Sequence, residues 1–152
     1  MFVHEIPEPW RSRLVNQPMP DLGDTPCVGG PPLRDRRISL ITTAGLHLHG
    51  DRPFIPGTAD WRVIPDDADP AEIVTSHIAA NFDRIGMMSD INTVLPIDRL
   101  HELVADGTVG AAAARHFGFM GSTPPTAYAD SIKTLADDMK RGEVNGVVLA
   151  GV

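Results

Sequence analysis

Short apolar runs alternate with longer segments of helical periodicity along this chain, and that alternation is typical of an α/β domain. Four apolar runs have the length and the bounding residues of strands, and they cover residues 38–44, 61–64, 74–78 and 144–152. The run at 38–44 ends at Gly45, which favours a buried parallel strand followed by a turn. A loop-like segment is expected at 45–56, and a turn or brief helix at 66–73. The segment at 81–92 is polar and contains glycine and methionine.

Two segments have the spacing of helices that are apolar on one face. Residues 96–107 carry apolar side chains at helical spacing, and Gly107 suits the end of that helix. Residues 126–141 follow two prolines, end before Gly142 and place four apolar side chains on one face: Tyr128, Ile132, Leu135 and Met139. A buried parallel strand is expected directly afterwards, at 144–152. We therefore predict an open, mainly parallel sheet with flanking helices, layered as in flavodoxin or Rossmann folds.

The composition predicts one domain preceded by an arm. The chain has 152 residues, a single-domain size. Residues 1–36 are rich in proline and glycine without a sustained period, so we expect an irregular arm that wraps the domain or a partner, and an α/β domain at 37–152. A parallel strand normally continues through a loop into a covering helix. We therefore expect the domain to be incomplete at its C-terminus, with these parts lost or supplied by another chain.

Charge and cysteine content narrow the classes of function. The formal net charge of −7 argues against nucleic acid as a partner. The single cysteine, Cys27, excludes an intrachain disulfide and leaves no cysteine pair for zinc. The N-terminus lacks the pattern of a signal peptide, and no run approaches the length of a membrane span. We expect a cytoplasmic protein without a membrane partner.

Polar residues after the first strand form one candidate site. His47, His49, Asp51 and Arg52 offer acid–base and anion-binding chemistry where a doubly wound fold places its site. The His-x-His pair could also hold a metal ion. The alternative is a solvated polar loop.

A second candidate cluster lies farther along the chain. His77, Asp83, Asp90 and Asn92 could position a polar substrate or shift a neighbouring pKa. Alternatively, Asp83 and Asp90 cap turns, Arg84 pairs with Asp83, and His77 is a buried, hydrogen-bonded histidine.

A third cluster covers residues 115–125. Gly118 and Gly121 allow a close backbone approach, and the segment leads to a helix N-terminus, which favours anions. The apolar residues of this segment are expected in the core; they are Phe117, Phe119 and Met120.

Several segments together carry a resemblance to a known family. They are ITTAGLHLHGDRPF, ADWRVIPDD, VTSHIAANFD, SDINTVLPIDRLHELVADGTVG, HFGFMGST and VNGVVLAGV. In this order they resemble the glycine/sarcosine/betaine reductase selenoprotein B and D-proline reductase family, especially its short single-domain members. The similarity runs from about Ile38 to the last residue.

The resemblance implies an oxidoreductase subunit with reductive chemistry. A selenocysteine, or a cysteine in its place, is expected just after the strand that ends near Val152. Its selenolate attacks an activated carbon that bears nitrogen, the C–N bond breaks, and a thiol reductant recycles the selenium. The expected partners are a small amino-acid-like or amine substrate and a second reductase subunit that carries a pyruvoyl group. We also expect an oligomer.

The resemblance also selects site residues. Our hypothesis is that His47, Asp51 and His77 are catalytic: His77 lines the pocket together with Asp83, and His47 assists proton transfer to the leaving nitrogen. The residues assigned to substrate binding are Asp83, Asp90, Asn92, His116 and Gly121. The resemblance implies no metal site and, apart from the expected selenocysteine, no cofactor in this chain.

The nucleophile itself is absent from these 152 residues. Our hypothesis is that an in-frame UGA codon for selenocysteine follows codon 152, so that the 152-residue form is inactive. One alternative is a non-catalytic binding or assembly module that a partner chain completes. Another is a small metal-dependent hydrolase built on His47, His49 and His77.

Overall fold

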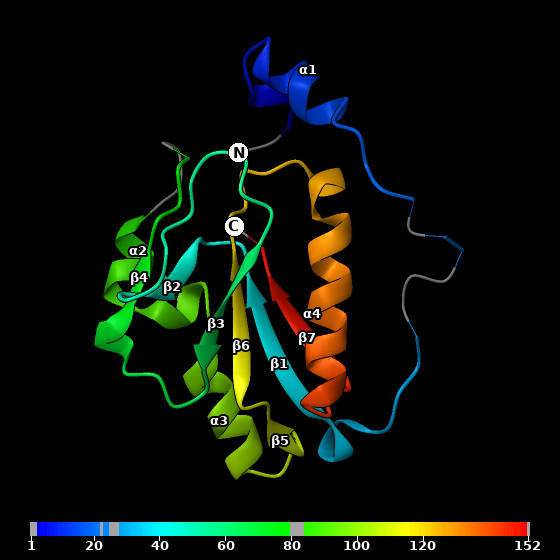
Figure 1. Ribbon diagram of the computed structural model, residues 1–152, viewed down its shortest axis with the longest axis vertical. Coiled ribbons are helices and arrows are strands. Elements are labelled where there is room, and N and C mark those ends of the chain that lie inside the picture. Colours follow the sequence, from blue (N-terminus) through cyan, green and yellow to red (C-terminus); the bar gives the residue numbers. More distant parts are fainter. Residues whose placement is uncertain (1–2, 22, 25–27, 80–83, 152) are drawn as a thin grey trace.

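The computed structural model describes residues 3–21, 23–24, 28–79 and 84–151. It contains a five-stranded mixed sheet (Figure 1). The strands of this sheet are β1 (Arg37–Thr42), β3 (Trp61–Pro65), β5 (Ala111–Ala112), β6 (Arg115–Phe119) and β7 (Gly146–Ala150). Strands β5, β6 and β7 all pair with β1 in parallel, and β3 pairs with β6 antiparallel. The predicted α/β fold with a mainly parallel sheet is confirmed.

The remaining elements surround this sheet. Strands β2 (Leu46–Leu48) and β4 (Ile73–Thr75) form a separate antiparallel pair. The α-helices are α1 (Trp10–Val15), α2 (Arg84–Ser89), α3 (Ile97–Ala105) and α4 (Ala129–Arg141). The 3₁₀ turns are η1 (Val3–Glu5), η2 (Leu33–Asp35), η3 (Pro70–Glu72), η4 (Ile91–Thr93) and η5 (Pro125–Tyr128). None of the helices in the described ranges is long and apolar enough to cross a membrane.

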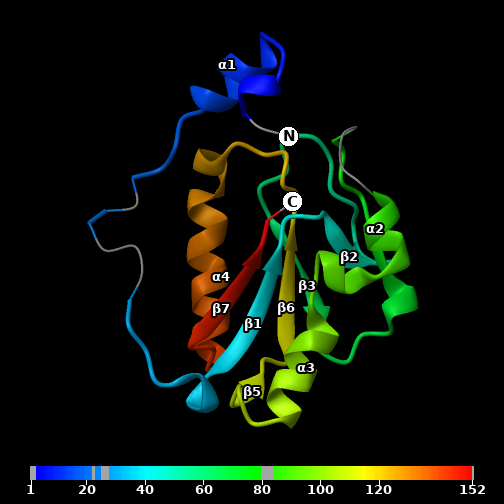
Figure 2. The same ribbon diagram turned by 180° about the vertical axis from the view of Figure 1, so that it is seen from behind.

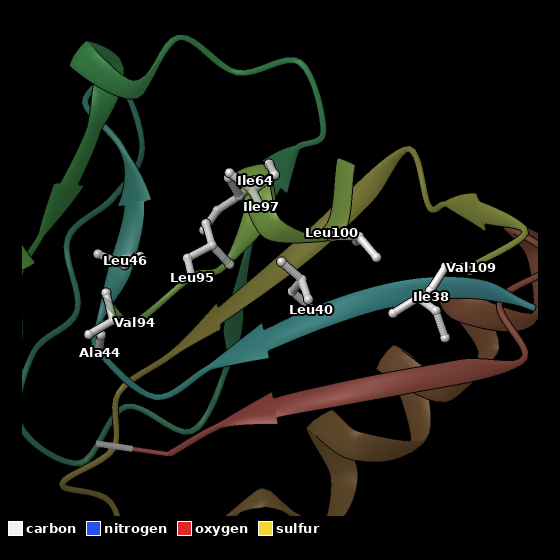
Figure 3. Packing of buried hydrophobic residues seen from close by; sticks show 10 residues of the cluster. All are labelled: Ile38, Leu40, Ala44, Leu46, Ile64, Val94, Leu95, Ile97, Leu100 and Val109. Atoms are coloured by element: carbon white, nitrogen blue, oxygen red, sulfur yellow. The ribbon is translucent and has the colours of Figure 1, made fainter. Parts of the chain in front are cut away.

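Two apolar clusters bind the layers together. On one face of the sheet, Leu135 of α4 packs with Phe117 and Phe119 of β6. On the other face, residues of β1, β3, α3 and the β2 segment form the larger cluster (Figure 3). Alternate residues of a strand point to opposite faces, so β1 and β3 contribute to both clusters. The burial predicted for Phe117, Phe119 and Met120 is confirmed.

The two helices that were predicted from a long pattern of apolar residues at helical spacing are both present. Helix α3 occupies the predicted 96–107 segment, and Gly107 follows it with a φ of +78°. The predicted 126–141 helix begins as the 3₁₀ turn η5 and continues as α4. Leu135 is buried as expected, but Ile132 is 53% exposed because the contact with the sheet runs through Leu135 and Met139.

Two sequence expectations were wrong, and one segment had no predicted element. Residues 45–56 are not all loop, because residues 46–48 form β2 by pairing with the distant β4. The sequence predicted no element for the polar segment after residue 81, and its described part contains helix α2 and turn η4. Strand β7 is not buried, since Val147, Val148 and Leu149 are 43%, 44% and 73% exposed. It pairs with β1 along one edge, whereas the apolar clusters are centred on β1, β3 and β6.

Candidate site at the carboxyl edge of the sheet

Strands β1, β6 and β7 end at the same edge of the sheet (Figure 2). The segments that follow them are joined by hydrogen bonds: the Thr43 amide donates to the carbonyl of Ala150 at 3.1 Å, and the Gly121 amide donates to that of Thr43 at 2.9 Å. In open α/β sheets, ligands bind beyond the carboxyl ends of the strands. This edge is therefore the candidate functional site.

Two glycines allow the segments at this edge to approach closely. Gly45 has a φ of +66°, and a Cβ there would lie 2.8 Å from the amide nitrogen of His77. A Cβ at Gly121 would lie 2.7 Å from the carbonyl oxygen of Thr43. The glycines therefore permit the backbone packing that brings His77 to the edge, as the sequence predicted for Gly121.

His77 is a buried histidine beside Gly45. It is 7% exposed, and its Nδ1 accepts a hydrogen bond from the Ala79 amide at 3.3 Å. Arg84 donates to the His77 carbonyl oxygen at 2.6 Å. Burial lowers the pKa of His77, and the nearby Arg84 charge lowers it further. The ring is therefore neutral near pH 7, with its proton on Nε2.

His47 is a second buried imidazole, on β2. It is 3% exposed, and its Nδ1 lies 2.7 Å from the carbonyl oxygen of Leu48. A carbonyl only accepts, so Nδ1 carries the proton and Nε2 presents a lone pair. Nε2 has no hydrogen-bond partner within the part of the chain that the structure describes. The ring packs edge-on against Phe54, with centroids 6.0 Å apart.

Asp51 holds the turn that follows β2. Its carboxylate accepts a hydrogen bond from the Leu48 amide at 3.1 Å, and the Asp51 amide donates to the Leu48 carbonyl at 3.0 Å. Neighbouring His49 is exposed. Among the described residues, no group of three or more histidine, cysteine, aspartate or glutamate side chains could hold a metal ion. The arrangement thus does not assemble His47, His49 and His77 into a metal centre.

Asp90 and Asn92 connect η4 to helix α3. The Asp90 carboxylate accepts from the backbone and side-chain amides of Asn92, both at 2.9 Å. Asn92 also donates to the Asp98 carboxylate at 2.8 Å and accepts from the Asp98 amide at 3.0 Å. The hydrogen bonds from Asn92 lower the pKa of Asp90. These contacts fit the capping role that was the alternative prediction for Asp90, and Asp83 lies outside the described residues, as does Cys27.

His116 is fully buried near the amino end of β6. Its Nδ1 accepts from the Leu40 amide at 3.1 Å, and its Nε2 donates to Asp66 Oδ1 at 2.8 Å. Burial lowers its pKa, although the hydrogen bond and charge of Asp66 act in the opposite direction. His101 Nε2 lies 2.9 Å from the same Asp66 oxygen. The structure thus gives His116 a place in the sheet interior and does not bring it to the carboxyl edge.

Sequence reasoning missed the partners of His116. Asp66 and His101 lie 50 and 15 residues from it in the chain, so no local spacing connects them. Only the strand and helix packing makes Asp66 the shared acceptor.

Comparison with known proteins identifies the family. The profile of the family described as Glycine/sarcosine/betaine reductase selenoprotein B (GRDB) matches residues 63–152. The chain belongs to this family. The matching region begins within β3, includes β6 and β7, and also covers His77 and His116.

Two curated relatives from this family of reductases are similar to parts of the chain. The D-proline reductase subunit gamma of Acetoanaerobium sticklandii is 37% identical over 90 residues, which is 59% of this chain and 36% of the relative. The glycine reductase complex component B subunit gamma of Symbiobacterium thermophilum is 26% identical over 140 residues, 87% of this chain and 32% of the relative. The chain therefore spans about a third of the length of these relatives. No solved structure matches it significantly.

Proposed function

We propose that this chain is part of a selenoprotein B-type reductase subunit, and that the carboxyl edge of its sheet forms one side of the active site. The reaction would be the reductive cleavage of a C–N bond in a small amino-acid-like or amine substrate. Family membership and the names of the relatives support the reaction class. We further propose that the nucleophile, a selenocysteine or cysteine, belongs to the segment that follows β7.

The register of β7 is the observation that carries this proposal. Five residue pairs join β7 to β1 in parallel, from Ile38 with Gly146 to Thr42 with Ala150. Ala150 thus lies beside Thr42, and its carbonyl accepts from the Thr43 amide. In the proposal, the nucleophile would leave the sheet at this point, beside Thr43, whose carbonyl accepts from the Gly121 amide. When present there, a selenolate supplies the attacking atom, since a selenol ionises more readily than a thiol.

In this proposal, the buried histidines His77 and His47 would transfer protons. The neutral ring of His77 carries its proton on Nε2, and this group would hydrogen-bond a substrate or donate to a leaving nitrogen. The lone pair on His47 Nε2 can accept a proton and assist that transfer. Asp51 would act through the turn that positions β2, because its carboxylate is engaged by the Leu48 amide.

The proposed function also requires a second protein subunit and a reductant. Both relatives are named as subunits, one of them of a glycine reductase complex. We propose that a second subunit carries a pyruvoyl group that activates the substrate amine, and that a thiol reductant regenerates the nucleophile. Substrate-binding roles for Asp83, Asp90, Asn92 and Gly121 remain part of the proposal, whereas the contacts of His116 favour a positioning role.

The first experiment reads the coding DNA after codon 152. We expect an in-frame UGA followed by an open frame that encodes a nearby cysteine and an amphipathic helix. The longer chain, with cysteine at the UGA position, is then assayed with its partner subunits for thiol-dependent reduction. The readout is release of ammonia or an amine from glycine, sarcosine and betaine, and ring opening of D-proline, whose nitrogen stays in the product. A stop codon other than UGA, or no activity with any of these substrates, contradicts the proposal.

Variants of the longer chain test the histidines. We expect His77→Gln to lower kcat at least ~100-fold, because general acid–base groups contribute about that much or more. His101→Gln is the matched control, since His101 is an exposed histidine bound to Asp66 and is not part of the carboxyl edge. Equal kcat for His77→Gln and the unmodified chain would remove His77 from the site.

A second candidate function is a non-catalytic assembly module. The exposed apolar side chains of β7 favour it, because such a strand is a template for a partner. A coding frame that continues without selenocysteine or cysteine near β7 would favour this function over the reductase.

A further inference from the structure

A cavity of about 350 Å³ lies at the opposite edge of the sheet, near the amino ends of β1 and β5. Its lining residues are Arg34, Asp35, Arg36, Arg37, Gly110, Ala111, Glu143 and Asn145. Three arginines face two carboxylates, so the lining carries a net positive charge in a chain whose overall charge is −7. Neither the carboxyl-edge site nor the proposed reaction uses these residues.

The guanidinium groups of this cavity are only loosely neutralised. The Arg34 guanidinium lies 4.0 Å from the Asp35 carboxylate, and the Arg37 guanidinium lies 3.7 Å from that of Glu143. Arg36 donates one hydrogen bond, from Nε to the Pro31 carbonyl at 2.6 Å. A guanidinium has five N–H donors. Within the described chain, most donors of this trio are therefore available to a ligand.

The backbone that carries the arginines is fixed on both sides. The Ala111 amide donates to the Arg36 carbonyl at 2.9 Å, and a Cβ at Gly110 would lie 2.6 Å from the Arg34 carbonyl oxygen. On the other side, the Arg37 amide donates to the Asn145 side chain at 2.8 Å, and the Asn145 amide donates back to the Arg37 carbonyl at 3.2 Å. Binding would therefore cost little ordering of the main chain.

Glu143 occupies a position that favours glycine. It follows the end of α4 with a φ of +56°, the left-handed region in which a side chain is strained. Its side chain is 82% exposed, and its carboxylate lies 3.7 Å from the Arg37 guanidinium, beyond hydrogen-bond distance. Glycine would end the helix at lower conformational cost, so the termination of α4 does not explain this carboxylate. At the cavity, however, it competes with any anion for Arg37.

We propose that this cavity binds a doubly charged oxyanion of a small molecule, either a phosphate group or a dicarboxylate. Arg36 and Arg37 donate the main hydrogen bonds, with Arg34 contributing its charge from the rim. Planar guanidinium groups match the geometry of both kinds of oxyanion. Glu143 reduces the affinity by competing for Arg37. This inference does not depend on the proposed reductase function, because the two sites lie at opposite edges of the sheet.

The experiment is a titration of the purified ¹⁵N-labelled chain followed by NMR. The probes are inorganic phosphate, succinate and acetate, at low ionic strength and about pH 8, where phosphate is mostly doubly charged. We expect saturable shifts of the Gly110, Ala111 and Asn145 amides with phosphate or succinate, and weaker binding of acetate. Saturation by phosphate alone assigns a phosphate group, and saturation by succinate alone assigns a dicarboxylate. Saturation by both assigns the shared oxyanion chemistry.

Variants of the lining residues test whether the anion binds in this cavity. Arg36→Gln and Arg37→Gln should each weaken binding of the active probe about tenfold, the effect of losing a charge-assisted hydrogen bond. Glu143→Gln should tighten it severalfold, because a competing carboxylate is removed. Arg99→Gln is the control, since Arg99 is an exposed arginine paired with Glu102 on α3. The absence of saturable shifts with both dianions, weaker binding in Glu143→Gln, or an equal loss in Arg99→Gln would overturn the proposal.

Discussion

Two histidines, His77 and His116, titrate below the ordinary histidine pKa of 6.5 because they are buried. The charge of Arg84 adds to this effect at His77, whereas Asp66 partly offsets it at His116. Below about pH 6.5 the unfolded chain therefore binds more protons than the folded chain. The contribution of these residues to stability is fully present above that pH and is lost as the pH falls toward their folded pKa values.

Because the unfolded chain binds more protons, we expect the folded state to lose stability as the pH falls, and part of this loss should come from His77. The urea midpoint should fall between about pH 7.5 and pH 5.5, above the range in which exposed carboxyl groups such as Asp90 titrate. His77→Gln should make this fall smaller, because one of the two groups is removed. Equilibrium unfolding monitored by circular dichroism measures both midpoints. A midpoint that stays constant over this range, or an unchanged fall in His77→Gln, would contradict the assignment of a lowered pKa.

At the scale of elements, the crossing of β2 over β6 depends on Gly118. A Cβ at Gly118 would overlap the carbonyl oxygen of Leu46, which is backbone and cannot rotate away. Gly118→Ala should therefore lower the free energy of unfolding by about 3 kcal/mol. Gly86→Ala is the matched control, because a Cβ at Gly86 in α2 meets nothing within 4 Å. That change should raise the free energy by about 0.5–1 kcal/mol.

Chemical denaturation of the two alanine variants separates the causes. Opposite signs for Gly118→Ala and Gly86→Ala would show that the cost arises from the contact with β2. A similar effect of both substitutions would show instead that it arises from the loss of glycine itself.

At the scale of the whole molecule, β7 presents apolar side chains and an edge that is unpaired within the described residues. Leu149 is 73% exposed and Val148 is 44% exposed. Exposed apolar edge strands promote association, so we expect the purified 152-residue chain to self-associate with rising concentration. Leu149→Lys should reduce that association, as measured by sedimentation or light scattering.

Val28→Lys provides the control for this prediction. Val28 is 88% exposed and lies outside the sheet, and the substitution adds the same charge to the chain. Equal loss of association in both variants would show that net charge, and not β7, governs it.

The helices and strands that could be predicted were those marked by a pattern of apolar residues within a short stretch of the chain. Periodic apolar positions located α3 and α4, and short apolar runs located β1, β3 and β7. Strand β2 was missed because three residues carry too little pattern, and its pairing with β4 joins segments about 27 residues apart. Strand β6 was not predicted as a strand either, although its core residues were.

The sequence by itself determined the fold class, the family resemblance and the residues with chemical potential, because these depend on residue types in order along the chain. Only the tertiary structure decided what each residue contacts. It placed His77 at the carboxyl edge, enclosed His116 between β1 and Asp66, and engaged Asn92 in the capping of α3. It also gathered three arginines around one cavity. These outcomes depend on distances between residues far apart in the chain, which local periodicity does not encode.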